Sequence, residues 1–202
     1  MHPNPAFRRV DDARSLELVR ERSFGILIAQ RAEGPLASHI PFLLSEDGRV
    51  VEFHLVRNSA MARAIADGAA VRLIVEGPEG YISPDWYGIA DQVPTWNYVA
   101  VHLVGEARLT DEGGFHDLLD RLSAHFEARL LPKKPWTSDK MTEGVMERMM
   151  RSIVPCAMQV SDLQSTWKLG QNKTEDARLG AAEGLEGLGN TTLARLMRRT
   201  PE

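Results

Sequence analysis

The sequence predicts a mainly β, α+β protein in which six antiparallel strands form a closed or nearly closed barrel with helices packed outside. Six separate segments have the apolar pattern of strands. The turn at Ser45–Gly48 ends in Asp-Gly, the strongest short signal for a hairpin. Strands and helices do not alternate regularly, which argues against a doubly wound parallel sheet.

The predicted strands differ in their patterns. The apolar run at 24–29 is too short for a helix and predicts a strand buried on both faces. In 49–56 apolar residues alternate with polar ones such as His54, which predicts a strand with one buried face. Pro41 indicates an edge or bulge, and Gly105 a bulge or close approach. The six strands are expected at 24–29, 36–44, 49–56, 70–76 (ended by Gly77-Pro78), 97–109 and 154–160.

Helices are predicted between and after these strands. Residues 115–130 repeat large apolar side chains every three or four positions, which predicts an amphipathic helix. Asn58 is expected to cap a short helix and Asn190 the last one. The remaining helices are expected at 12–21, at 141–150 and in the tail after 173. We expect residues 1–162 to form the barrel domain with peripheral helices, and 163–202 a C-terminal turn and helical tail packed on the barrel or on a partner subunit.

Composition narrows the class of protein. The chain has 202 residues, 43% of them hydrophobic, and a net charge of −4. That charge argues against binding nucleic acid over the whole surface, so DNA contact would need a local basic patch. A single cysteine, Cys156, excludes an intrachain disulfide and a four-cysteine zinc site. No apolar run has the length of a membrane span and no signal peptide is evident, so we expect a cytoplasmic protein without membrane contact.

No motif for a metal, a nucleophile or a common nucleotide loop is present. His39, His54 and His102 lie on predicted strands and could converge on a metal, but separate structural or surface histidines are the favoured interpretation, and one or two of them could line a ligand pocket. Cys156 lies in an apolar strand, which is typical of an inert core thiol. We therefore predict neither a metal site nor a catalytic residue.

Three segments are richer in polar and aromatic residues than packing requires. Residues 53–59 lead from a strand into a helix start with Arg57, where a phosphate could bind or a solvated arginine could lie beside a capped helix. Residues 80–98 carry aromatic rings among Ser, Thr and Asn, which could stack on a planar ligand, close a barrel end or form a subunit interface. Residues 167–173 place a ring, two lysines and two amides in one turn, which could equally be an exposed polar turn.

Taken in order, these segments resemble a known family. Residues 38–42 (SHIPF), 53–65, 77–87 (with GYISPDWY), 93–98 (VPTWNY) and 167–173 (WKLGQNK) are similar to the ordered motifs of PaiB-like, FMN-binding negative transcriptional regulators. The similarity covers nearly the whole chain. It implies a split β-barrel like that of pyridoxamine-phosphate oxidases, and a homodimer with FMN at the subunit interface.

The resemblance also implies which residues bind FMN. Arg57, Asn58 and the backbone around Ser59 would hold the phosphate. The ring system would be flanked by His39, Pro41, Phe42 and His54 and closed by Trp96 and Asn97. Lys168, Gln171 and Asn172 would reach in from the same or the partner subunit.

The chain departs from the family pattern at several positions. Ala60 and Met61 stand where oxidase relatives carry basic phosphate ligands, so Arg57 or a lysine of the 167–173 turn would have to replace them. The PaiB-like pattern has proline at the position of Ser59 and serine at that of Gly170.

Two functions follow from the resemblance. The first is an FMN-binding transcriptional regulator, although the only basic clusters are Arg129, Lys133 and Lys134, and Arg195, Arg198 and Arg199. The alternative is a flavin-dependent oxidoreductase acting on a small molecule, in which the flavin supplies the redox chemistry.

Overall fold

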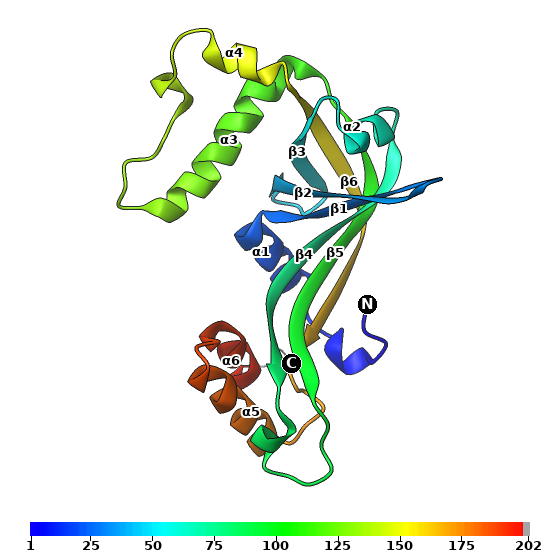
Figure 1. Cartoon of the computed structure of the whole chain (residues 1–202), viewed down its shortest axis with the longest axis vertical. Helices are drawn as coiled ribbons and strands as arrows, with labels where there is room; N and C mark the ends of the chain where they lie inside the picture. The colour runs from blue at the N-terminus through cyan, green and yellow to red at the C-terminus, as the bar shows by residue number, and fades with distance from the viewer. Residues whose placement is uncertain (200–202) are drawn as a thin grey trace. The chain divides into compact units, whose positions relative to one another are not determined.

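The computed structural model describes residues 1–199. In it, six strands form a closed antiparallel barrel in the order β1-β2-β3-β6-β5-β4 (Figure 1). The predicted antiparallel barrel is therefore confirmed. The Asp-Gly turn joins the second and third strands as expected, closed by a hydrogen bond from Ser45 N to Val50 O. The strands are β1 (Phe24–Arg31), β2 (Gly34–Leu44), β3 (Val50–Val56), β4 (Ala69–Ile82), β5 (Thr95–Leu109) and β6 (Ile153–Lys168).

The helices lie close to their predicted places. Asn190 caps the last helix by accepting a hydrogen bond from Leu193 N, as predicted. The second helix is capped by the Ser59 hydroxyl rather than by Asn58, because Ser59 is the residue whose side chain reaches Ala62 N. The helices are α1 (Asp12–Arg22), α2 (Ala60–Ala64), α3 (Phe115–Glu127), α4 (Val145–Met150), α5 (Glu175–Gly187) and α6 (Thr191–Arg198).

Three strand predictions need correction. β6 does not end at residue 160 but continues to Lys168. β4 does not end at Gly77-Pro78 but continues to Ile82. A Cβ on Gly77 would lie 2.7 Å from Val99 Cβ, so the glycine permits close packing against β5 instead of ending the strand. β1 is not fully buried on both faces: its residues alternate between buried and half-buried or exposed. The outer face of a barrel strand is covered only where another element packs on it.

Gly105 and Pro41 were both expected at irregular positions of a strand, and the structure shows what each one does there. A Cβ on Gly105 would lie 1.9 Å from Gln159 O, so the predicted close approach of two backbones is confirmed. Pro41 is not on an edge strand, because β2 lies between β1 and β3. It is the last β2 residue to pair with β1, and the pairing with β3 begins at Phe42. A residue without an N–H is tolerated at this change of partner.

The chain divides into two compact units, each with its own core. One unit holds residues 19–74 and 103–162, and its core consists of the inward side chains of the barrel. The other holds residues 1–18, 75–102 and the described residues from 163 onward. β4, β5 and β6 contribute residues to both units, and the expected boundary at 162 falls inside β6.

In the barrel unit, helix α3 packs through one apolar stripe. Phe115, Leu118 and Leu122 are buried, and Leu43 and Ile153 pack against them. The Arg121 guanidinium donates to both carboxylate oxygens of Glu52 on β3, at 2.8 and 3.0 Å. These contacts hold the helix against β3 and its neighbours.

In the other unit, α5 and α6 lie side by side (Figure 1). Helix α5 presents two glycines to Trp86: a Cβ on Gly184 would lie 2.3 Å from the indole, and one on Gly180 would lie 2.4 Å from the carbonyl oxygen of Trp86. Trp86, singled out in the aromatic segment, is thus a packing residue of this unit.

Candidate functional site

A cavity of about 320 Å³ opens in the barrel unit between the outer face of the sheet and helix α3. β2 and β3 contribute Pro41 and His54, two of the residues that the sequence singled out. The other lining residues come from α3 and the segment after it: Leu119, Leu122, Ser123, Phe126, Glu127 and Trp136. The walls are therefore mostly apolar, with a few polar groups, which is the usual make-up of a small-molecule site.

His54 is the polar group on the sheet side of this cavity. On β3 its side chain lies on the opposite face from Phe53 and Leu55, which are buried in the barrel core. Among the described residues, His54 Nδ1 is the one buried side-chain nitrogen or oxygen without a hydrogen-bond partner. Burial lowers the pKa of His54, so the imidazole is neutral at pH 7, with one ring nitrogen a donor and the other an acceptor.

Glu127 is the acidic group of the cavity. Its carboxylate accepts from Lys133 Nζ at 2.5 Å and from the backbone N–H of Trp136 at 2.8 Å. The hydrogen bond from Lys133 lowers the pKa of Glu127 most, and that from the Trp136 backbone lowers it further, so the carboxylate stays ionised. Glu127 thus fixes the segment that carries Trp136 to the end of α3, and adds a negative charge to the cavity wall.

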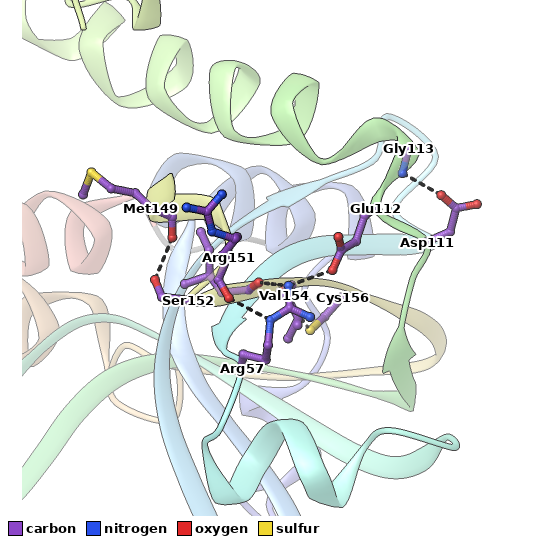
Figure 2. Close-up of polar contacts among 10 residues, drawn as sticks. Arg57, Asp111, Glu112, Gly113, Met149, Arg151, Ser152, Val154 and Cys156 are labelled. Carbon is purple, nitrogen blue, oxygen red and sulfur yellow. Dashed lines mark hydrogen bonds and ion pairs between the residues drawn. The ribbon is translucent and has the colours of Figure 1, made fainter. Parts of the chain in front are cut away.

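The Arg57 side chain is engaged within the barrel unit (Figure 2). Its Nε donates to Arg151 O at 2.9 Å, and its Nη2 donates to Glu112 Oε1 at 2.7 Å and to Ile153 O at 3.0 Å. The guanidinium therefore ties the end of β3 to the start of β6 and to the segment before α3.

The two residues after Arg57 have local roles. The Ser59 hydroxyl accepts from Ala62 N at 3.0 Å and so caps α2. Asn58 is exposed, and its carbonyl accepts from Arg63 Nη1 at 2.6 Å. The three residues expected to bind the phosphate therefore make hydrogen bonds within the protein: Arg57 at the end of β3, and Asn58 and Ser59 at the start of α2.

The remaining candidate residues on β2 lie on opposite faces of the strand, because side chains alternate along it. Phe42 is completely buried in the barrel core, on the opposite face from Pro41, and does not line the cavity. His39 shares the outer face with Pro41 but is exposed, stacked against Phe24 with ring centroids 6.3 Å apart. Of the four residues expected around the ring, the structure brings Pro41 and His54 together.

The other unit contains the candidates at β5. Trp96 is 55% exposed and makes an edge-to-face contact with Tyr81. Asn97 is 1% exposed and donates from Nδ2 to Met197 Sδ at 3.4 Å. Adjacent strand residues point to opposite faces, so these two side chains do not close one site together.

The candidates after β5 lie at the end of β6 and in the turn that follows. Lys168 Nζ donates to Thr95 Oγ1 at 2.5 Å, and Asn172 is exposed. The Gln171 amide bonds its own turn, accepting from Leu169 N at 2.8 Å and donating to Trp167 O at 2.5 Å. Gln171 therefore shapes the turn that separates Lys168 from Lys173.

Sequence reasoning missed the α3 side of the cavity. Leu119, Leu122 and Phe126 were recognised only as part of a helical apolar stripe, and the same period places Ser123 on that face. Trp136 follows a Pro-Lys-Lys-Pro break and carries no periodic signal. Its place at the cavity depends on Glu127, nine residues earlier.

The structure also bears on three further features: metal-binding groups, the single cysteine and the apolar character of the helices. Within residues 1–199, His, Cys, Asp and Glu side chains form no group of three or more that could hold a metal ion. Cys156 is buried in the barrel, and burial raises the pKa of its thiol to about 12. Among the helices of the described chain, none has the length and apolar character needed to cross a membrane.

Comparison with known proteins identifies a family to which the chain belongs and solved structures that share its fold. The model of the family described as "Putative FMN-binding domain" matches residues 1–162. Protease synthase and sporulation protein PAI 2 of Bacillus subtilis is 29% identical over 185 residues, which cover 90% of this chain and 88% of that protein.

Two solved structures share the fold of this chain. The FAD and heme binding protein from Mycobacterium smegmatis aligns with a TM-score of 0.58 at 17% identity, covering 80% of this chain and 73% of that one. The flavocytochrome Anf3 from Azotobacter vinelandii aligns with a TM-score of 0.54 at 13% identity, covering 83% of this chain and 72% of that one.

Proposed function

The chain belongs to the FMN-binding domain family, its cofactor is FMN, and on that premise we propose that the cavity between His54 and helix α3 receives the flavin ring. The observation that carries this proposal is the buried Nδ1 of His54, which has no partner among the described residues. An unsatisfied buried polar atom destabilises a fold by about 1–3 kcal/mol unless a ligand or water satisfies it. The edge of a flavin ring offers both donors and acceptors to a neutral imidazole.

The cavity fits a ring system better than it fits a phosphate. Its volume lies at the lower end of the roughly 300–1,000 Å³ of small-molecule sites, and its walls are aliphatic and aromatic. The residues that line the cavity offer a phosphate no cation, because Glu127, the charged residue among them, is a carboxylate that only accepts hydrogen bonds and is already paired with Lys133. The phosphate of the cofactor is therefore expected to lie outside this cavity.

When bound, FMN supplies the redox chemistry. The protein residues position it and control its surroundings. His54 holds a neutral ring nitrogen toward the ligand, Pro41 covers the sheet side, and Phe126 and Trp136 exclude water from the α3 side. The lowered pKa of His54 keeps a positive charge away from the ring at pH 7.

We further propose that the protein is a cytoplasmic homodimer that acts as a PaiB-like negative transcriptional regulator. The role is supported by the 29% identity to a protein named for protease synthesis and sporulation.

A dimer is supported in the barrel unit by two exposed apolar side chains, Phe24 at 52% and Val56 at 61%. Sedimentation of the purified protein tests the dimer. A salt-dependent gel shift tests DNA contact, and NADH-dependent turnover tests the oxidoreductase alternative.

The cavity assignment is tested by titrating FMN into wild type, H54A and H116Q, following quenching of flavin fluorescence. His116 is the matched control because it lies on the exposed side of α3, paired with Asp120. We expect H54A to raise the FMN Kd about tenfold, the loss of one buried hydrogen bond, and H116Q to leave it unchanged. Equal affinity of all three proteins would place the ring elsewhere, and failure of the wild type to bind FMN would remove the proposed function.

A further inference from the structure

Another cavity, of about 420 Å³, lies in the unit that contains residues 1–18 and the described residues from 163 onward. We call it the N-terminal cavity. Its volume is within the roughly 300–1,000 Å³ of small-molecule sites. The flavin site proposed above belongs to the other unit and does not account for it. The lining residues come from the N-terminal segment, the start of α1 and β6: Met1, Arg8, Asp12, Leu163, Gln164 and Ser165.

The N-terminal cavity lies along the part of β6 that has passed one of its strand neighbours. β6 lies between β3 and β5, but its pairing with β3 ends at Gln159, whereas the strand itself continues to Lys168. Residues 163–165 are therefore beyond the β3 pairing, where the polar backbone groups of a strand edge are open to other partners. The N-terminal segment meets the same stretch, since His2 N donates to Thr166 Oγ1 at 3.2 Å.

Two opposite charges line the N-terminal cavity without being paired. Arg8 Nη2 donates to Pro3 O at 3.3 Å, and the guanidinium has four further N–H donors. Asp12 begins α1, where the positive end of the helix dipole favours a carboxylate. Within residues 1–199, neither side chain forms an ion pair. A ligand with one charge would meet a like charge as well as an opposite one, whereas a zwitterion would satisfy both.

Ser165 provides an observation that is independent of these charges. Its residue is only 8% exposed, and it lines the cavity. Among the described residues its hydroxyl has no hydrogen-bond partner, and unlike His54 Nδ1 the oxygen is not fully enclosed. A nearly buried hydroxyl in this position can donate to a ligand oxygen or accept from a ligand N–H, and it loses stabilisation while it does neither.

We propose that the N-terminal cavity binds a free α-amino acid, with the ligand carboxylate on Arg8 and the ligand ammonium group on Asp12. The planar guanidinium suits a carboxylate because it can donate two parallel N–H bonds to it. The Ser165 hydroxyl hydrogen-bonds to one of the two charged groups, and Leu163 contacts the ligand side chain. A short peptide carries the same two charges and is the other source of this chemistry. The proposal goes beyond the proposed function and does not depend on FMN.

The first measurement is isothermal titration calorimetry of wild type with glycine, L-leucine and L-leucylglycine. The singly charged forms of each amino acid are titrated beside it: the N-acetyl form keeps only the carboxylate, and the amide keeps only the ammonium group. We expect wild type to bind the zwitterion about tenfold more tightly than either singly charged form, because each lacks one charge-assisted contact. Binding of leucylglycine without binding of either amino acid would assign the site to short peptides.

Variants assign the two charges to their residues. R8Q and D12N should each raise the Kd of the amino acid about tenfold. They should also differ in the analogue they prefer: R8Q should favour the amide and D12N the N-acetyl form, a reversal that a purely structural role would not produce. S165A should raise the Kd about threefold. R9Q and E17Q remove exposed charges that do not line the cavity, and both should match wild type.

The proposal is overturned if wild type binds none of the three zwitterions at up to about 10 mM. It is also overturned if a singly charged form binds as tightly as its parent amino acid, or if the folded R8Q and D12N proteins bind the amino acid as wild type does. A change only in the sedimentation coefficient of these two variants would overturn it too, because the charges would then pair with a second chain. FMN titration of the same proteins is read separately, so failure of the flavin site leaves this result intact.

Discussion

Arg57 and Glu112 form an ion pair in which Nη2 and Oε1 are 2.7 Å apart. The same guanidinium donates to the carbonyls of Arg151 and Ile153, so one side chain joins three segments that are distant in sequence (Figure 2). This gives Arg57 a structural role at a position where a family resemblance alone implies a cofactor ligand.

Replacing Arg57 should therefore affect stability more than cofactor binding. The pair is partly exposed, so R57M should lower the free energy of unfolding by about 0.5–1 kcal/mol. The FMN Kd should stay within about threefold. Urea unfolding and FMN titration measure the two quantities, with E112Q as the partner variant. A tenfold weaker Kd at unchanged stability would show instead that Arg57 binds the phosphate.

His54 should make stability depend on pH. Burial lowers its folded-state pKa below the ordinary value of 6.5, so between these two values the unfolded chain binds more protons. The free energy of unfolding should rise with pH through that window and level off above about 6.5. The H54Q variant should show a shallower rise in urea midpoint between about pH 5 and 7.

The pKa of His125 is also lowered, first by burial and then by Arg129, so its effect on stability has the same sign. H125Q should remove a separate part of the slope, and the two variants together should nearly flatten it. Parallel curves for wild type and H54Q would mean that His54 has the same pKa in both states.

Gly105 should tolerate no side chain. In G105A the new Cβ would lie 1.9 Å from the carbonyl oxygen of Gln159, a backbone atom that cannot move aside alone. We expect a loss of about 3 kcal/mol or more, because strands must separate. G187A, where no atom lies within 4 Å of the added Cβ, should be neutral or slightly stabilising. Comparable melting temperatures for the two variants would contradict the close approach.

Arg121 should hold α3 on β3 through charge. It donates to Glu52 and to Asp117, all partly exposed, so R121M should lower the free energy of unfolding by about 0.5–1 kcal/mol at low salt. The difference from wild type should shrink at about 1 M salt because of screening. R31M removes an exposed pair within a turn and serves as the control. A difference that does not change with salt would indicate packing rather than charge.

Cys156 should be unreactive while the protein is folded. Its pKa of about 12 leaves almost no thiolate at pH 8, and the side chain is buried. Iodoacetamide should label it in denaturant but not under native conditions, as read by mass. Rapid native labelling would mean that the barrel opens at β6.

Local signals in the sequence predicted much of the fold. The Asp-Gly turn after Ser45 predicted the hairpin, Gly105 predicted the close approach of two backbones, and Asn190 predicted a helix cap. The hairpin and the cap depend on residues that are near in sequence, and the close approach depends on the lack of a side chain at Gly105. The end of β4 was mispredicted because Gly77 also has a packing use, which is visible only when Val99 lies opposite.

The candidate site was less predictable. Strand alternation could have separated Pro41 from Phe42 and Trp96 from Asn97, since neighbours on a strand point to opposite faces. The partners of Arg57 could not be found this way, because Glu112 and Arg151 lie 55 and 94 residues away. The acidic wall of the cavity likewise depends on Glu127 meeting the Trp136 backbone.

The length of β6 has a practical consequence for anyone who shortens this chain. A fragment cut at residue 162, where the family match ends, would stop midway along a strand that runs to Lys168. It would strip β5 of part of its hydrogen-bonded neighbour and discard the buried Trp167. The bared strand edge would invite self-association, so a soluble fragment has to keep the whole of β6.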